Sequence, residues 1–155
     1  MELILWRHAE AEDRAKDSDA DSARELTKRG RKQAERMAAW LAPRLDRSWR
    51  ILVSPAKRTL QTIEPLERDF EQSDAVGLAA TAKSVLHAAG WPDGADNVLV
   101  VGHQPTLGNV AARLLDGHEA DVSIRKGAVW WFVTRDRDGQ RETVLRVVID
   151  PETLE

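Results

Sequence analysis

Short apolar runs alternate along the chain with longer stretches in which apolar side chains recur every three or four residues. The apolar runs at residues 3–6, 51–53 and 98–101 have the length of buried β-strands. The longer stretches predict four helices: one that begins near Thr27 and is stopped by Pro43, and three at residues 57–66, 81–89 and 106–115. Strands that alternate with helices are typical of βαβ units, in which the strands lie parallel.

The C-terminal third has a different pattern. Residues 129–134 and 143–149 are strand-like and flank the turn signal Asp138-Gly139, which predicts an antiparallel hairpin. We interpret the charged residues 135–138 as a solvated turn. The pattern as a whole predicts one α/β domain over residues 1–155: a three-layer α/β/α sandwich with a mostly parallel sheet and an antiparallel edge near the C-terminus.

Composition narrows the class of protein. A chain of 155 residues can bury a core without a disulfide or a metal. It has no cysteine, which excludes thiol nucleophiles and cysteine-ligated zinc and suits a reducing compartment. A net charge of -3 argues against a general nucleic-acid binder. No apolar run is long enough for a membrane span and no signal peptide is evident, so we expect a cytoplasmic protein that binds neither membranes nor nucleic acid.

The polar stretch at residues 10–24 is long for a loop in a compact domain, and such loops are often functional. Within this stretch, three aspartates stand at alternate positions, as in the opening of a calcium loop: Asp17, Asp19 and Asp21. The match fails where calcium loops need glycine and glutamate, because Ser22 and Lys28 stand there. We therefore predict a solvated acidic loop.

Two histidines each follow a predicted strand: Arg7-His8 after the first and Gly102-His103 after the third. Arg58 follows the second strand, a few residues after Ser54. The carboxyl ends of parallel strands line one crevice, so these side chains are expected to meet there. Arginine binds phosphate with two parallel hydrogen bonds, and a neutral imidazole can attack phosphorus. We expect one histidine to attack and the other to donate to the phosphoryl oxygens, with both arginines as the clamp.

In their order and spacing, four segments of the chain resemble the histidine phosphatase superfamily, in particular its small single-domain phosphohistidine phosphatases. The segments are Leu5-Trp6-Arg7-His8-Ala9-Glu10-Ala11, Leu26-Thr27-Lys28-Arg29-Gly30, Val53-Ser54-Pro55-Ala56-Lys57-Arg58-Thr59-Leu60-Gln61-Thr62 and Val100-Val101-Gly102-His103-Gln104-Pro105-Thr106. The resemblance implies a phosphate pocket of Arg7, His8, Arg58 and His103. It also implies that His8 is transiently phosphorylated and that no metal or other cofactor takes part.

The chain departs from the wider superfamily at two places. Ala9 stands where glycine is usual, which we do not interpret as inactivating. The segment at residues 75–80 has no carboxylate, whereas members that cleave phosphate esters carry an acidic proton donor there. Because an imidazole can be protonated before it departs, this absence favours a nitrogen–phosphorus substrate. Glu10, Glu12 and the preceding Asp74 remain alternative donors.

We therefore expect a metal-independent phosphatase that hydrolyses phosphohistidine on a partner protein. A small chain without an evident cap insertion leaves its pocket open to such a macromolecule. One alternative is a phosphatase of small-molecule phosphomonoesters. The other is a non-catalytic module that binds phosphate or a phosphoprotein.

Overall fold

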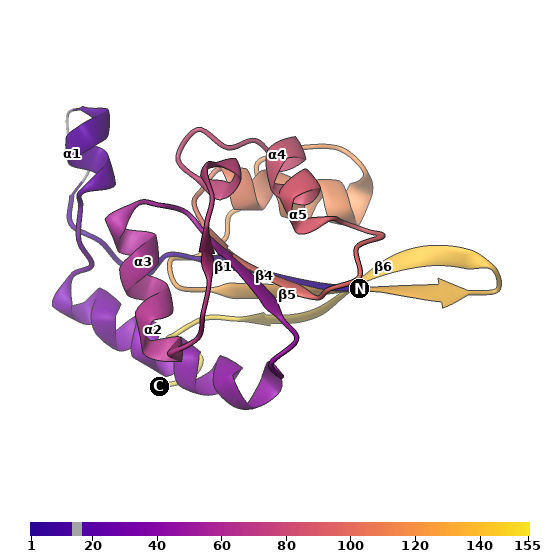
Figure 1. The fold of residues 1–155 in the computed structure, drawn as a ribbon, viewed down its shortest axis with the longest axis horizontal. Coiled ribbons are helices and arrows are strands. Elements are labelled where there is room, and N and C mark those ends of the chain that lie inside the picture. Colours follow the sequence, from indigo (N-terminus) through magenta and orange to yellow (C-terminus); the bar gives the residue numbers. More distant parts are fainter. Residues whose placement is uncertain (14–16) are drawn as a thin grey trace.

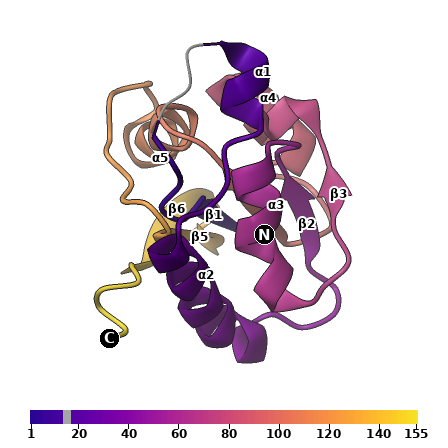
Figure 2. The same ribbon diagram turned by 90° about the vertical axis from the view of Figure 1, so that its left-hand side faces the viewer.

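The computed structural model describes residues 1–13 and 17–155 and contains one mixed six-stranded sheet with helices on both faces (Figures 1 and 2). The strand order is β3-β2-β4-β1-β5-β6. The first four strands of this order lie parallel, and β5 and β6 are antiparallel. The strands are β1 (Glu2–Arg7), β2 (Arg50–Val53), β3 (Glu71–Gln72), β4 (Val98–Gly102), β5 (Val129–Arg137) and β6 (Gln140–Ile149).

The helices lie in the connections from β1 to β5. They are α1 (Ser18–Ser22), α2 (Lys28–Leu41), α3 (Lys57–Ile63), α4 (Ala82–Ala89) and α5 (Thr106–Asp116), with short 3₁₀ helices at Ala42–Arg44, Glu64–Leu66 and Asp74–Val76. The predicted fold class is confirmed, as are the three apolar strands and the N-cap of α2 at Thr27. The helix predicted at residues 81–89 is α4, and Thr81 is its N-cap. In the described part of the chain, every helix is too short or too polar to cross a bilayer.

The core lies in two layers because successive side chains of a strand point to opposite faces of the sheet. On β1, Leu3 and Leu5 pack on the face covered by α4 and α5. Ile4 and Trp6 pack on the opposite face, which α2 and α3 cover. All four side chains have no exposed surface, so β1 is the buried centre of the sheet.

One predicted helix ends where expected and one ends early. As predicted, α2 ends just before Pro43: it stops at Leu41 and continues as a 3₁₀ turn that contains this proline. The helix predicted at residues 57–66, α3, ends already at Ile63, before a 3₁₀ turn with Pro65. Proline lacks the amide hydrogen for a helical bond and clashes with the preceding turn. Strand β3 was not predicted, since its two exposed residues carry no apolar pattern.

The hairpin is longer than predicted. Residues 135–137, which we interpreted as part of a turn, belong to β5, and the turn itself is only Asp138-Gly139. Both turn residues have positive φ angles, 52° and 80°, as a two-residue hairpin turn requires. Cross-strand pairs such as Arg135 with Glu142 let charged side chains extend the ladder beyond the core.

The acidic stretch at residues 10–24 is not simply a solvated loop. It contains the helix α1, whose first turn is capped by Asp17: its carboxylate accepts a hydrogen bond of 2.8 Å from the Ala20 amide. Figure 1 shows α1 projecting from the end of the sheet opposite to the hairpin. Residues 14–16 of this stretch lie outside the described residues.

Candidate active site

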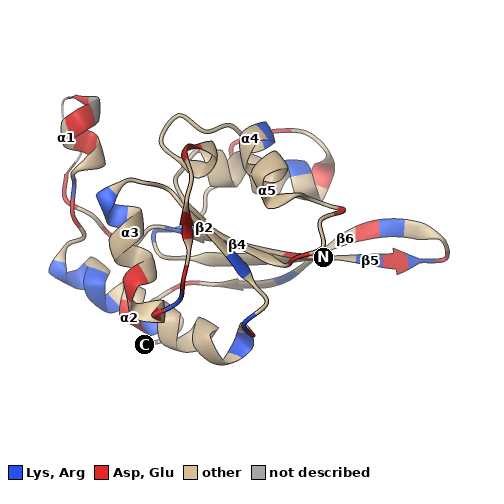
Figure 3. Ribbon diagram, viewed as in Figure 1, with Lys and Arg blue, Asp and Glu red and all other residues tan. Residues whose placement is uncertain are grey.

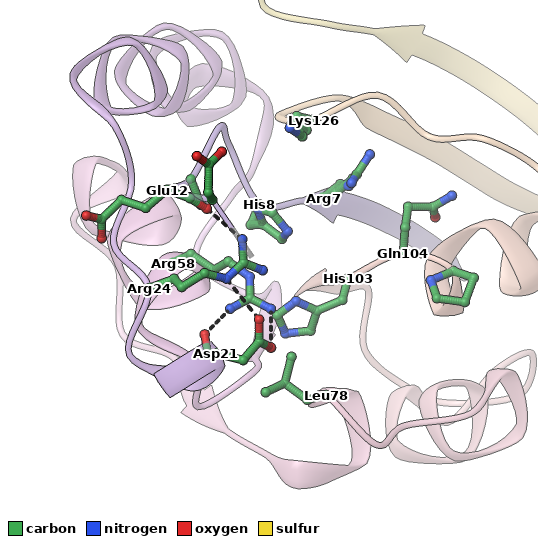
Figure 4. A pocket seen from close by; sticks show the side chains of 13 residues that line it. Arg7, His8, Glu12, Asp21, Arg24, Arg58, Leu78, His103, Gln104 and Lys126 are labelled. Atoms are coloured by element: carbon green, nitrogen blue, oxygen red, sulfur yellow. Dashed lines mark hydrogen bonds and ion pairs between the residues drawn. The ribbon is translucent and has the colours of Figure 1, made fainter. Parts of the chain in front are cut away.

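The carboxyl ends of β2, β4 and β1, which are neighbours in the sheet, form the floor of a pocket. The His8 amide donates to the Gly102 carbonyl at 3.1 Å, and the Ser54 amide donates to the Val101 carbonyl at 3.1 Å. These two hydrogen bonds keep the residue after β1 and the residue after β2 beside the carboxyl end of β4. The pocket has a volume of about 510 Å³ and is lined by Arg7, His8, Ala11, Glu12, Asp13, Asp21, Arg24, Arg58, Leu78, His103, Gln104, Pro105 and Lys126 (Figure 4).

His8 is buried at the end of β1 with its ring in a defined orientation. Its Nδ1 lies 2.7 Å from the Ala9 carbonyl oxygen, which can only accept, so Nδ1 carries the proton and Nε2 keeps its lone pair. The Ala9 amide donates in turn to Thr62 Oγ1 at 3.1 Å. Burial lowers the pKa of His8 to about 3, although the hydrogen bond to Ala9 opposes this shift. The imidazole is therefore neutral at physiological pH, as a nucleophile must be.

His103 follows β4 and faces His8, with 5.5 Å between the two ring centres. Its Nε2 lies 2.7 Å from Ser54 Oγ, and both residues are buried. Burial, and next the charge of Arg58, lower the pKa of His103 to about 4. Its Nδ1 is buried and has no hydrogen-bond partner among the described residues.

The two predicted arginines meet in the same pocket. Arg7 donates from one terminal nitrogen to the Ile124 carbonyl at 2.8 Å, while its buried Nε has no partner in the described part of the chain. Arg58 is almost fully buried. Burial, and next the charge of Arg58, lower the pKa of Arg7, which reflects the cost of gathering cations here. An anion bound between them would offset that cost.

The segment with α1 closes one side of this pocket. Arg58 donates to the Asp21 carbonyl at 2.8 Å and forms an ion pair of 3.4 Å with its carboxylate. Asp21 also pairs with Arg24 at 2.9 Å, and Arg24 donates to the Glu12 carbonyl at 2.7 Å. Partial burial favours the neutral form of Asp21, but Arg58 and Arg24 hold its pKa below the usual value. The prediction of a solvated loop is therefore wrong for Asp21.

The three carboxylates weighed as proton donors lie in different places. Only Glu12 lines the pocket. Glu10 accepts a hydrogen bond from Thr27 Oγ1 at 2.8 Å, and Asp74 is exposed and not among the lining residues. Outside residues 14–16, no three side chains of His, Asp or Glu are arranged to hold a metal ion.

The geometry agrees with that of known proteins. Phosphohistidine phosphatase SixA of Escherichia coli strain K12 is 31% identical over 131 residues, which cover 76% of each chain. Its homologue in Haemophilus influenzae strain Rd is 33% identical over 129 residues, 74% of this chain and 77% of that protein. The model of the histidine phosphatase superfamily (branch 1) matches residues 3–76. The chain belongs to the histidine phosphatase superfamily.

A solved structure of a member of the histidine phosphatase superfamily has the same fold over its full length. This is the protein histidine phosphatase SixA complexed with tungstate, which is 27% identical, with a TM-score of 0.79 and complete coverage of both chains. Tungstate is a tetrahedral oxyanion, like phosphate.

Sequence reasoning on this histidine phosphatase missed the contributions of Ser54, Asp21, Arg24 and Lys126. Ser54 stood in a quoted segment, but its bond to His103 joins residues 49 positions apart. Arg24 and Asp21 carried the signal of an unusually long polar stretch beside Arg7-His8. Lys126 lies in a region whose approach to the pocket no local pattern indicates.

Proposed function

We propose that the protein hydrolyses phosphohistidine on a partner protein, with His8 as the transient phosphoryl carrier and without a metal. The observation that carries this proposal is the state of the His8 ring. A backbone carbonyl holds its Nδ1 proton, and burial keeps the ring neutral, so Nε2 presents a lone pair beside two guanidinium groups. This is the arrangement that in-line attack on a phosphoryl group requires.

In the first step, His8 Nε2 forms a bond to phosphorus while the bond from phosphorus to the substrate nitrogen breaks. The electron pair of that bond stays with the substrate imidazole, which takes up a proton from water at the open rim of the pocket. Water then attacks the phosphorus on His8, the bond to Nε2 breaks, and inorganic phosphate leaves with the free imidazole restored.

Arg7, Arg58 and His103 are proposed to hold the phosphoryl oxygens. Arg7 Nε and His103 Nδ1 are buried polar atoms that find no partner among residues 1–13 and 17–155, and such oxygens would be partners for them. Binding of a dianion favours the protonated form of His103, because opposite charge stabilises an imidazolium. Both ring nitrogens of His103 then carry a proton, so Nδ1 can donate to a phosphoryl oxygen when substrate is present.

The substrate class rests on two further observations. The relatives described above carry the name phosphohistidine phosphatase. The pocket, at about 510 Å³, has room for more than a phosphate ion and opens at its rim, where Glu12 and Lys126 are exposed. A histidine on the surface of a protein fits such a pocket, and a cysteine-free chain suits the cytoplasm.

One observation favours the rival function, a phosphatase of small-molecule phosphomonoesters. Glu12 lines the pocket, and a carboxylate there could protonate an alkoxide leaving group. A steep loss of phosphomonoester hydrolysis in Glu12→Gln, together with fast turnover of alkyl phosphates by the unaltered protein, would make this the better answer.

The decisive experiment is rapid-quench labelling with a phosphohistidine protein. We expect acid-labile phosphate on His8, no turnover by His8→Ala, and retained binding of tungstate by that variant, since Arg7, Arg58 and His103 remain. His87→Ala is the matched control, because His87 is exposed on α4 and does not line the pocket. Label on another residue would exclude this mechanism. If the unaltered protein bound the phosphohistidine protein but did not hydrolyse it, the non-catalytic binding module would be the better interpretation.

A further inference from the structure

One large apolar side chain lies in a pocket whose other walls are mostly charged. The described part of the chain exposes four such side chains: Phe70, Leu78, Leu115 and Val148. Of these, only Leu78, which is 44% exposed, lines the pocket with the two histidines. Its exposure is not explained by the fold, because the core on this face is built by Val76 and not by Leu78.

The backbone around Leu78 is held on both sides. Before it, the Gly77 amide donates to the Asp74 carbonyl at 3.0 Å. After it, the Ala80 amide donates to the Gly77 carbonyl at 3.2 Å, and Thr106 Oγ1 donates to the Ala80 carbonyl at 3.2 Å. The bend therefore presents Leu78 at a fixed place on the pocket wall.

The position of Leu78 relative to His8 determines what it can touch. Figure 4 shows Leu78 at the edge of the pocket beyond His103, on the side away from His8 and Lys126. In an in-line displacement the leaving group departs on the side of phosphorus opposite to the nucleophile. The group nearest to Leu78 would thus be the leaving group and not the phosphoryl oxygens.

We propose that Leu78 is a specificity-determining residue that packs against the imidazole ring of the phosphohistidine substrate. This inference rests on the proposed function. An imidazole ring has apolar carbon edges and faces, whereas ammonia, the leaving group of phosphoramidate, has none. A leucine in contact with the ring favours the first substrate over the second by the apolar surface that it covers.

The test compares kcat/KM for a phosphohistidine peptide and for phosphoramidate, which deliver the same phosphoryl group. Leu78→Ala should lose about five- to thirtyfold on the peptide and change little on phosphoramidate. Leu78→Met, which keeps most of the apolar volume, should recover most of the peptide activity. Leu115→Ala is the matched control, since Leu115 is 50% exposed on α5 and outside the pocket.

Three results would overturn the inference. Equal losses on both substrates would assign Leu78 to the phosphoryl pocket or to folding, and an unchanged peptide rate would remove it from the reaction. In both cases the unaltered protein still hydrolyses the peptide, so the proposed function stands. Failure of the unaltered protein to hydrolyse any phosphohistidine would overturn the proposed function and this inference together.

Discussion

At the scale of single residues, burial is the main cause of the unusual properties of the two histidines. His8 and His103 are 6% and 5% exposed, and in both cases burial is the largest cause of the lowered pKa. The same burial lowers the stability of the folded protein in acid, because these histidines bind protons in the unfolded chain that they do not bind in the folded protein.

The free energy of unfolding should therefore depend on pH above the range in which carboxylates titrate. The folded-state pKa values, about 3 and about 4, lie below the ordinary value of 6.5, so stability is fully present above pH 6.5 and is lost as the pH falls. Each histidine contributes a slope of up to about 1.4 kcal/mol per pH unit. Urea unfolding of the wild type and of His103→Gln, repeated between pH 6.5 and 4.5, measures this slope. The variant should show about half the slope, and an unchanged slope would contradict the assignment.

Arg58 should contribute far more to catalysis than a surface arginine. If it holds the phosphoryl group in the transition state, Arg58→Ala should lower kcat/KM by about thirty- to a thousandfold, or about 2 to 4 kcal/mol. Arg58→Lys should recover only part of this, because lysine lacks the planar fork. Steady-state kinetics with a phosphohistidine peptide checks both. Arg137→Ala, on the exposed part of the hairpin, is the control. Full activity of Arg58→Ala would remove this residue from the site.

At the scale of elements, short helices and close backbone contacts position the site. The stretch after β1 lies against the first turn of α2, where a Cβ on Gly30 would stand 1.9 Å from the Glu10 carbonyl oxygen. The Thr27 amide donates to that same carbonyl at 3.0 Å. This contact fixes where the chain leaves the pocket, and α1 then returns Asp21 to Arg58.

Removing the charge of Asp21 should strengthen oxyanion binding. The Asp21 carbonyl still accepts from Arg58 in Asp21→Asn, so the guanidinium stays in place while one negative charge leaves the pocket. We expect the affinity for tungstate, measured by calorimetry at low salt, to rise about three- to tenfold. Asp19→Asn is the control, since Asp19 belongs to the same helix but does not line the pocket. Weaker binding by Asp21→Asn would show that orientation of Arg58 by the carboxylate outweighs its charge.

At the scale of the whole molecule, the pocket and the hairpin lie at opposite ends of the sheet. The pocket is at the carboxyl end of β1, whereas β5 and β6 extend beyond its amino end (Figure 1). The N-terminal amine donates to Thr134 Oγ1 at 3.0 Å where the hairpin leaves the core. Figure 3 shows basic and acidic residues along the outer part of the hairpin, so this part is stabilised by its ladder and by ion pairs.

A change at the hairpin turn should therefore affect stability without affecting activity. Gly139 has a φ of 80°, which alanine adopts at a cost of about 1 kcal/mol. Gly139→Ala should lower the Tm by about 2 to 4 °C and leave kcat/KM for a phosphohistidine peptide unchanged. Gln140→Ala, at the next position, which is also exposed, is the control. A loss of activity in Gly139→Ala would show that the hairpin takes part in substrate binding.

The sequence by itself was sufficient for the features that depend on neighbours along the chain. Fully buried strands such as β4 appear as unbroken apolar runs, and Thr27 and Thr81 show where helices begin. The turn at Asp138-Gly139 is local in the same way. Because parallel strands end at one edge, placing Arg7-His8 and Gly102-His103 after two strands was enough to predict that they share a pocket.

Only the tertiary structure decided which groups hold these side chains and how their chemistry is tuned. Asp21 reaches Arg58 across 37 positions of the chain, and Ser54 reaches His103 across 49. The lowered pKa values of the histidines likewise come from burial under elements that are distant in sequence. Hydrogen bonds and desolvation depend on distances of a few ångströms in space. The periodic pattern of apolar residues along the chain does not specify those distances.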